Sequence, residues 1–124
     1  MKKLLFVALF ASMGLGATTA MADGWPLSVL GNWSVVANQS AGTLSITSQG
    51  LGDCQPIKGT IFGNSIVGFY CPHSGRIHFL RNNGATTIQD YTANVSQAGP
   101  TLRMGGVFDS DLGAFGEYNF SGTK

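Results

Sequence analysis

Residues 56–91 read PIKGTIFGNSIVGFYCPHSGRIHFLRNNGATTIQDY, and they carry the clearest structural signal in this 124-residue chain. Apolar and polar residues alternate here in short runs, which is typical of half-buried β-strands. The runs are separated by dipeptides that favour two-residue hairpin loops, at Gly63-Asn64, Ser74-Gly75 and Asn83-Gly84. Pairing the residues on either side of these loops predicts antiparallel strands, with Ile61 opposite Ile66 and Phe79 opposite Ile88.

This predicted register sorts the side chains onto two faces, because successive residues of a strand point to opposite sides. We expect the more apolar face to be interior, and it holds Ile57, Gly59, Ile61, Ile66, Gly68, Tyr70, Ile77, Phe79 and Ile88. The opposite face holds Lys58, Thr60, Val67, Phe69, Arg76, His78, Leu80, Thr87, Gln89 and Tyr91. The same count pairs Ile77 with Asp90, and so predicts that Asp90 and Thr92 point inward.

Similar alternation over the rest of the chain predicts an all-β protein of eight strands. Their expected ranges are 31–38, 42–48, 56–62, 65–71, 76–82, 86–96, 101–108 and 115–121. The connections are short, so strands that are neighbours in sequence should pair antiparallel. Eight such strands most simply close into an up-and-down barrel, because closure removes exposed edges. We expect one domain over residues 23–124, with residues 23–30 as an N-terminal arm.

The first 22 residues, MKKLLFVALFASMGLGATTAMA, have the features of a secretory signal peptide. Lys2 and Lys3 precede an apolar run, and Ala20 and Ala22 are small residues at the positions that a signal peptidase reads. The apolar run is too short for a permanent transmembrane helix. We therefore expect residues 1–22 to be removed and the protein to be exported, to the periplasm or to the extracellular medium.

Charge and motif content argue against several classes of function. The chain has 7 Lys+Arg and 6 Asp+Glu, and two of the basic residues lie in the expected signal peptide, so residues 23–124 carry a net charge of −1. We therefore expect no nucleic-acid partner. No second apolar run is long enough to span a membrane. The sequence contains no G-x-S-x-G, H-E-x-x-H or Walker motif, so we expect a non-enzymatic protein without a cofactor.

Cys54 and Cys71 are the two cysteines of the chain. In an exported protein two thiols usually form a disulfide, and closing a loop of about 18 residues stabilises a fold by about 3 kcal/mol in the chain-entropy model. The alternative is a metal site at Cys71, His73 and His78, but their spacing matches no metal-ligand pattern. We expect the bridge and no metal. The predicted register places Cys54 two residues beyond the position opposite Cys71, which requires its loop to bend.

The stretch GNWSVVANQSAGTLSI, residues 31–46, begins with a Gly-x-Trp sequence at the start of the first predicted strand. Gly31-Asn32-Trp33 at the start of an eight-stranded up-and-down barrel resembles the calycin architecture. That architecture includes lipocalins, avidin and streptavidin, and a family of small bacterial metalloprotease inhibitors. The length of the chain is more similar to the avidins and to the inhibitors. The resemblance covers the mature chain as a strand pattern, and Gly-x-Trp as a motif.

Similarity to the avidins implies a ligand site next to the first strand. That family places an Asn and a Ser there, over the ligand, and Asn38 and Ser40 stand at the matching positions. The family's next ligand residue is a Tyr that ends a Gly-Thr-Tyr run, but here the run ends in Ile61. Several tryptophans line the avidin pocket, whereas this chain has only Trp25 and Trp33, both near the mature N-terminus. These departures argue against tight biotin binding.

Asp90 is the most informative polar residue of the predicted interior. A carboxylate inside a small barrel needs a partner, a water or a ligand, and an eight-stranded barrel can enclose one small ligand. Together with Tyr70 and Thr92, Asp90 is expected to form the polar floor of a small pocket. The alternative is that Asp90 pairs internally or reaches solvent at an end of the barrel.

The inhibitor family acts through a short arm that precedes Gly-x-Trp and enters the protease cleft. DGWPLSVL, residues 23–30, stands at that place, and Trp25, Pro26 and Leu27 form a stiff apolar segment suited to docking. The alternative is that Trp25 covers an end of the barrel. The cysteines also depart from the inhibitor pattern, in which the bridge comes earlier in the domain.

The outer face of the predicted sheet carries an apolar patch. It consists of Val67, Phe69, Leu80 and Tyr91. Such a patch favours packing of one barrel against another, as in the homo-oligomers that the avidin resemblance implies. Taken together, the sequence predicts a secreted or periplasmic, non-enzymatic β-barrel that binds a small molecule or a protein, and the second hypothesis is a protease inhibitor that acts through residues 23–30.

Overall fold

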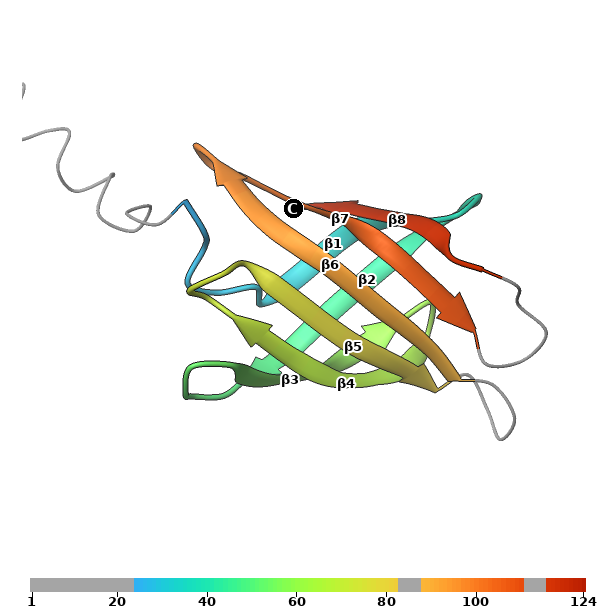
Figure 1. Cartoon of the computed structure of the whole chain (residues 1–124), viewed down its shortest axis with the longest axis horizontal. Coiled ribbons are helices and arrows are strands. Elements are labelled where there is room, and N and C mark those ends of the chain that lie inside the picture. The colour runs from blue at the N-terminus through green and yellow to red at the C-terminus, as the bar shows by residue number, and fades with distance from the viewer. Residues whose placement is uncertain (1–23, 83–87, 111–115) are drawn as a thin grey trace, which may run out of the picture.

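The computed structural model describes residues 24–82, 88–110 and 116–124, which form a closed barrel of eight antiparallel strands (Figure 1). The strands are β1 (Gly31–Ala37), β2 (Ser40–Gln49), β3 (Gln55–Ile61), β4 (Asn64–Cys71), β5 (Arg76–Asn82), β6 (Ile88–Ala98), β7 (Thr101–Ser110) and β8 (Tyr118–Thr123). Each strand pairs with its neighbours in sequence, and β1 pairs with β8 to close the barrel. The predicted all-β up-and-down barrel is confirmed.

Some of the predicted features lie outside the described residues. They are the signal peptide over residues 1–22, the hairpin loop at Asn83-Gly84, and Thr87. Within the described ranges, no helix has the length and apolar character that a membrane crossing requires.

Burial alternates along the strands, so one side of each strand faces the interior. The buried apolar side chains form one cluster, whose fully buried large members include Trp33, Leu44, Ile57, Ile61, Ile66, Tyr70, Ile77, Phe79 and Tyr91. Phe79 stacks on Tyr91 with ring centroids 4.8 Å apart, and Tyr91 stacks on Phe108 at 4.9 Å. The central part of the lumen is therefore a packed core.

The β3–β4 hairpin has the predicted faces but a different pairing. Ile61 pairs with Asn64 rather than with Ile66, so the two loop residues are Phe62 and Gly63. Both have positive φ, at 49° and 79°, as a type I′ hairpin turn requires. Because the pairing differs from the prediction by an even number of residues, the interior face of both strands is the predicted one.

The corrected pairing explains how the disulfide forms. The last pair of the β3–β4 ladder is Gln55 with Tyr70, so the next position places Cys54 directly opposite Cys71. The two cysteines form the predicted bridge, with a Cα–Cα distance of 4.1 Å. The bend that the sequence analysis required for Cys54 is therefore unnecessary.

A four-residue turn, 72–75, connects β4 and β5, where a two-residue loop was predicted. Cys71 pairs with Arg76, and the backbone N–H of Gly75 donates to the carbonyl of Cys71 at 2.9 Å. The observed pairing of β4 with β5 again differs from the predicted one by an even number of residues, so Ile77 and Phe79 face inward as predicted.

The pairing of β5 with β6 is the point at which the sequence-based register was wrong. Phe79 pairs with Tyr91, not with Ile88, which is a difference of an odd number of residues. The last described pair is Asn82 with Ile88, so residues 83–87 connect the two strands. Ile88, expected in the interior, is 45% exposed.

An odd difference turns every side chain of β6 to the other face. Tyr91, Ala93 and Val95 point inward and are at most 3% exposed, whereas Asp90 and Thr92 lie on the outer face. The physical reason is burial: this register removes three apolar side chains from water, and the predicted one would have desolvated a carboxylate. These energies outweigh the local preference of an Asn-Gly pair for a two-residue turn.

The N-terminal arm, residues 24–30, lies against one end of the barrel, at the left of Figure 1. Two buried aromatic side chains hold it there. The indole Nε1–H of Trp33 donates to the carbonyl of Val29 at 2.9 Å, and the hydroxyl of Tyr70 donates to the carbonyl of Pro26 at 2.6 Å. Since Val29 and Pro26 are themselves buried, the arm is part of the folded barrel and covers this end.

Candidate functional site

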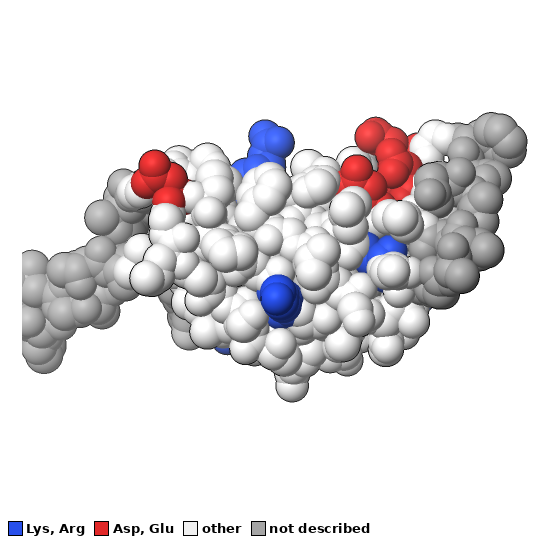
Figure 2. Space-filling model, turned by 90° about the horizontal axis from the view of Figure 1, so that it is seen from below, with Lys and Arg blue, Asp and Glu red and all other residues white. Residues whose placement is uncertain are grey.

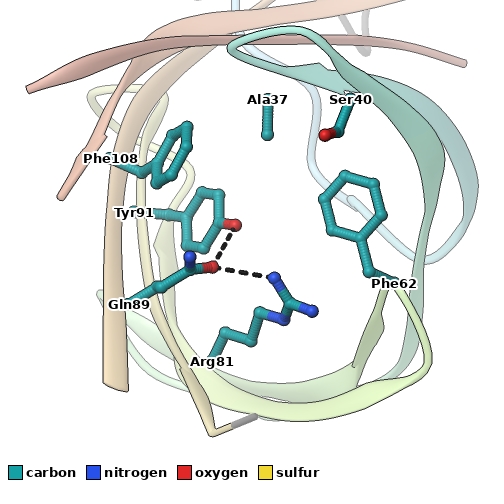
Figure 3. A pocket seen from close by; sticks show the side chains of 7 residues that line it. All are labelled: Ala37, Ser40, Phe62, Arg81, Gln89, Tyr91 and Phe108. Atoms are coloured by element: carbon teal, nitrogen blue, oxygen red, sulfur yellow. Dashed lines mark hydrogen bonds between the residues drawn. The ribbon is translucent and has the colours of Figure 1, made fainter. Parts of the chain in front are cut away.

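The opposite end of the barrel holds a pocket of about 240 Å³, which we call the open-end pocket (Figure 3). It is lined by Ala37, Ser40, Phe62, Arg81, Gln89, Tyr91 and Phe108. Ala37 ends β1 and Ser40 begins β2, whereas the arm contacts Gln49 at the far end of β2. The arm and the pocket therefore lie at opposite ends of the lumen.

Arg81 is the charged residue among the side chains that line this pocket. It continues the inward-facing series of Ile77 and Phe79 on β5, and it is half-buried. Its Nε and Nη2 both donate to Oδ1 of Asn64, at 3.0 and 2.6 Å, and its Nη1 donates to Oε1 of Gln89 at 2.8 Å. These bonds to β4 and β6 fix the guanidinium at the rim of the lumen.

Phe62 forms the part of the pocket wall that lies next to the Arg81 guanidinium. The guanidinium carbon of Arg81 lies 5.1 Å from the centroid of the Phe62 ring, which is within the range of a cation–π contact. Phe62 has a left-handed backbone conformation that is uncommon for a bulky residue. Gly42 makes room for its ring, since a β-carbon at Gly42 would lie 2.4 Å from the ring. The turn thus directs an aromatic side chain over the pocket.

Tyr91 and Gln89 complete the polar part of the pocket. The Tyr91 hydroxyl donates to Oε1 of Gln89 at 2.9 Å, so this oxygen accepts from Tyr91 and Arg81 together (Figure 3). Burial raises the pKa of the Tyr91 phenol, although a hydrogen bond with Arg81 and the positive charge of Arg81 oppose this shift. The phenol is therefore protonated at neutral pH, and its one O–H is the donor to Gln89.

The hydrogen-bond partners of Arg81 are neutral groups, which do not offset its charge. Its hydrogen-bond acceptors are the side-chain amides of Asn64 and Gln89, and among residues 24–82, 88–110 and 116–124 no carboxylate forms an ion pair with it. The ion pair found in those ranges joins His78 and Asp90 on the outer face. Among the described residues that line the pocket, Arg81 thus carries the one formal charge.

Of the two residues matched to the avidin site, the structure brings one into the pocket. Ser40 lines the open end beside Ala37. Asn38 lies in the exposed β1–β2 turn with a φ of 56°, and its backbone N–H donates to the carbonyl of Asn119 at 2.8 Å. A ligand role for either residue remains a prediction.

Asp90, Tyr70 and Thr92 do not form the polar floor that the sequence predicted. Asp90 and Thr92 point outward, for the reason given by the β6 register, and Asp90 Oδ1 lies 2.5 Å from Nε2 of His78. Tyr70 points inward as expected, but it lies at the arm end and not near the open-end pocket. Tyr70 is thus separated from Asp90 and Thr92, because the observed register of β6 turns those two side chains to the outer face.

Tyr70 has a structural contact that yields a pH prediction. Burial raises its pKa to about 12, from 10.0. Since the folded state disfavours the phenolate, the stability that the neutral phenol contributes should be present below pH 10 and lost as the pH rises toward 12. We expect Tyr70→Phe to lower the free energy of unfolding at pH 7 by about 1–2 kcal/mol, because the hydrogen bond to Pro26 is lost. Above pH 10, the stability of this variant should fall less steeply with pH than that of the unchanged protein. Thermal melts from pH 7 to 12 measure both effects, and equal alkaline slopes for the two proteins would contradict this role.

The arm residues proposed for protein docking have different environments. Trp25 is half-buried against the 72–75 turn, so close that a β-carbon at Gly75 would lie 2.4 Å from its ring. Pro26 is buried, and Leu27 is 67% exposed. Packing uses much of the Trp25-Pro26 surface, which leaves Leu27 as the accessible apolar side chain of the three.

The outer apolar patch is present with one exchange of residues. Val67, Phe69 and Leu80 are exposed by 52%, 38% and 38%, and Ile88 takes the place of the buried Tyr91. Figure 2, which views the barrel from the side of β3 and β4, shows a largely uncharged surface with scattered Lys, Arg, Asp and Glu. The homo-oligomer that this patch favours remains a prediction.

Sequence reasoning missed most of the open-end pocket. The inward direction of Arg81 could have been predicted, because residues 77, 79 and 81 lie on the same face of one strand. Gln89 and Tyr91 were assigned to the outer face by the wrong β6 register. Phe62 was expected at a strand end rather than in the turn, and no signal in the sequence brought Phe108 to this end.

Comparisons with known proteins give no relative. No family model, curated protein or solved structure matches the chain. Among the described residues, no group of three or more His, Cys, Asp or Glu could hold a metal ion. The site is therefore interpreted from its own residues.

Proposed function

We propose that this protein is an exported, non-enzymatic binding barrel that takes up a small molecule in its open-end pocket. The observation that carries the proposal is the asymmetry of the lumen. One end is covered by the arm, and the other holds a pocket in which Ser40, Gln89, Tyr91 and Arg81 supply polar groups beside aromatic rings. The lining thus combines polar and apolar side chains in similar measure, and converging polar groups of this kind fix the orientation of a small ligand.

The size of the pocket limits the ligand. Its volume of about 240 Å³ is below the range of roughly 300–1,000 Å³ that is typical for drug-sized ligands. The ligand is therefore about the size of a single ring or of two fused rings. The disulfide supports the proposed export, since such bridges persist in the periplasm and outside the cell.

Blocking the open end should weaken binding without unfolding the barrel. Ser40 begins β2 and is exposed at the pocket, while the next residue, Ala41, is exposed on the outer face. We expect indole, a neutral flat probe, to shift the amide NMR signals of Tyr91, Phe62 and their neighbours. Ser40→Trp should weaken this binding at least about tenfold, because the new ring occupies the pocket. Ala41→Trp is the matched control and should bind as the unchanged protein does.

Shifts that survive in Ser40→Trp, or that appear at the arm end instead, would place the site elsewhere. Indole is suited to this test because it carries no charge, so the result does not depend on how Arg81 interacts with a ligand.

A second candidate function is protein binding at the arm end, as in the inhibitor hypothesis. Gln49 Nε2 donates to the carbonyl of Leu27 at 3.0 Å and to Oε1 of Gln55 at 2.6 Å, and Gln55 donates to the carbonyl of Gly52 at 3.2 Å. These bonds tie the arm to the β2–β3 connection, which carries Leu51, 91% exposed. Two exposed leucines on adjoining segments favour a protein contact. Such binding would depend on Leu27 and Leu51, and not on Ser40.

A further inference from the structure

Resting on this proposed function, we propose that the open-end pocket selects a small organic anion, a carboxylate carried on a flat apolar body, with Arg81 as its charge partner. The proposal follows from three features of the pocket: an arginine held by neutral groups, unused donors on that arginine, and aromatic walls around it.

The first feature is the electrostatic balance of Arg81. Asn64 and Gln89 satisfy its hydrogen bonds but do not neutralise its charge, and the carboxylates described in the structure are not paired with it. A half-buried cation without a counter-charge is unfavourable, and an anion that enters the pocket relieves this. A cationic ligand would instead be repelled.

The second feature is the number of donors left over. A guanidinium has five N–H groups, and the three described hydrogen bonds use one each on Nε, Nη1 and Nη2. These three bonds leave one further N–H on each terminal nitrogen, and Arg81 also interacts with the Tyr91 hydroxyl at the pocket. Two N–H groups on adjacent nitrogens are the donors with which arginine binds a carboxylate through both oxygens.

Tyr91 directs its O–H to the same place as Arg81. Its hydroxyl and Nη1 of Arg81 both donate to one oxygen, Oε1 of Gln89, at 2.9 and 2.8 Å. The two donors, from β6 and β5, therefore converge on a single acceptor position (Figure 3). A ligand carboxylate that displaces the Gln89 amide from this position would accept both bonds with full negative charge, and such charge-assisted bonds are the stronger ones.

The third feature sets the shape of the ligand. Figure 3 shows Phe62 and Phe108 on opposite sides of the lumen, with Ala37 between them at the top of the view. These side chains offer flat apolar surfaces to a ring. Arg81 is the single Lys or Arg in the described lining, so the pocket matches one negative charge better than the two of a phosphate monoester.

The test compares benzoate with benzamide, which have nearly the same shape and differ in charge. Calorimetry and amide NMR on the full mature protein measure both affinities. We expect benzoate to bind at least about tenfold more tightly than benzamide. Arg81→Gln should weaken benzoate binding by roughly tenfold to hundredfold and leave benzamide binding within about twofold. Arg103→Gln, at an exposed position of β7, is the matched control and should change neither.

The comparison of benzoate with benzamide on the unchanged protein tests the proposal even if Arg81→Gln fails to fold. Arg81→Lys keeps the positive charge but loses the paired N–H groups of the guanidinium, so it should give an intermediate benzoate affinity. Equal binding of benzoate and benzamide, both lost in Ser40→Trp, would overturn the anion selectivity while the small-molecule site stands. Binding of indole without binding of benzoate would overturn it in the same way. Failure of all three probes to shift the pocket signals would overturn the anion site and the proposed function together.

Discussion

Replacing Trp33 with alanine should lower the free energy of unfolding by about 3–5 kcal/mol, the range found for large buried aromatic side chains. Trp33 is 0% exposed and belongs to the single core cluster of the barrel. It also holds the arm, through the 2.9 Å hydrogen bond from Nε1 to the carbonyl of Val29. The substitution therefore leaves a cavity and also an unsatisfied buried carbonyl, and both effects act in the same direction.

Urea unfolding monitored by circular dichroism measures this change. Val36→Ala is the matched control, since Val36 lies on the same strand but on the outer face, where it is 44% exposed. The control should change stability by no more than about 0.5 kcal/mol. A loss below about 1 kcal/mol for Trp33→Ala would mean that Trp33 is not the core residue at the covered end.

Loss of the disulfide should have the second-largest effect, a destabilisation of about 2–4 kcal/mol in Cys71→Ser. Cys54 and Cys71 tie the start of β3 to the end of β4, next to the pair of Gln55 and Tyr70. Since Tyr70 anchors the arm through Pro26, we also expect the arm to dissociate more readily in this variant. The measurement is urea unfolding with and without a reducing agent.

The reducing agent supplies the control for this substitution. It should destabilise the unchanged protein to about the level of Cys71→Ser and should leave Cys71→Ser itself unaffected. Equal stability of the oxidised and reduced wild-type protein would show that the bridge contributes nothing. Free thiols in the non-reduced protein would contradict the bridge itself.

The fold was predictable where local signals and burial agree. Ile57, Ile61, Ile77 and Phe79 alternate with polar residues, so their faces were correct even where the pairing differed by two residues. Asn83-Gly84 is a strong local turn signal, yet the pairing of Phe79 with Tyr91 is set by core packing across strands. A count from a turn cannot include that long-range energy.

The candidate site was less predictable because it depends on that same register. One odd difference moved Asp90 to the outer face and brought Gln89 and Tyr91 to the lumen. Ser40 was named because of the resemblance to the avidins. Arg81 was not named, although its position two residues after Phe79 on the same strand predicts that it points inward. The convergence of Arg81 and Tyr91 on Gln89 is a property of three side chains in space, which spacing along the chain does not encode.

Native mass spectrometry of the protein purified from the organism that makes it tests the central claim most directly, because it reports what the barrel binds there. We expect the unchanged protein to retain one small molecule, with a mass that fits one or two fused rings bearing an acidic group. Ser40→Trp, produced in the same organism, should lack this added mass, and Ala41→Trp should keep it. An added mass retained by Ser40→Trp, or a second protein in place of a small molecule, would contradict binding in the open-end pocket.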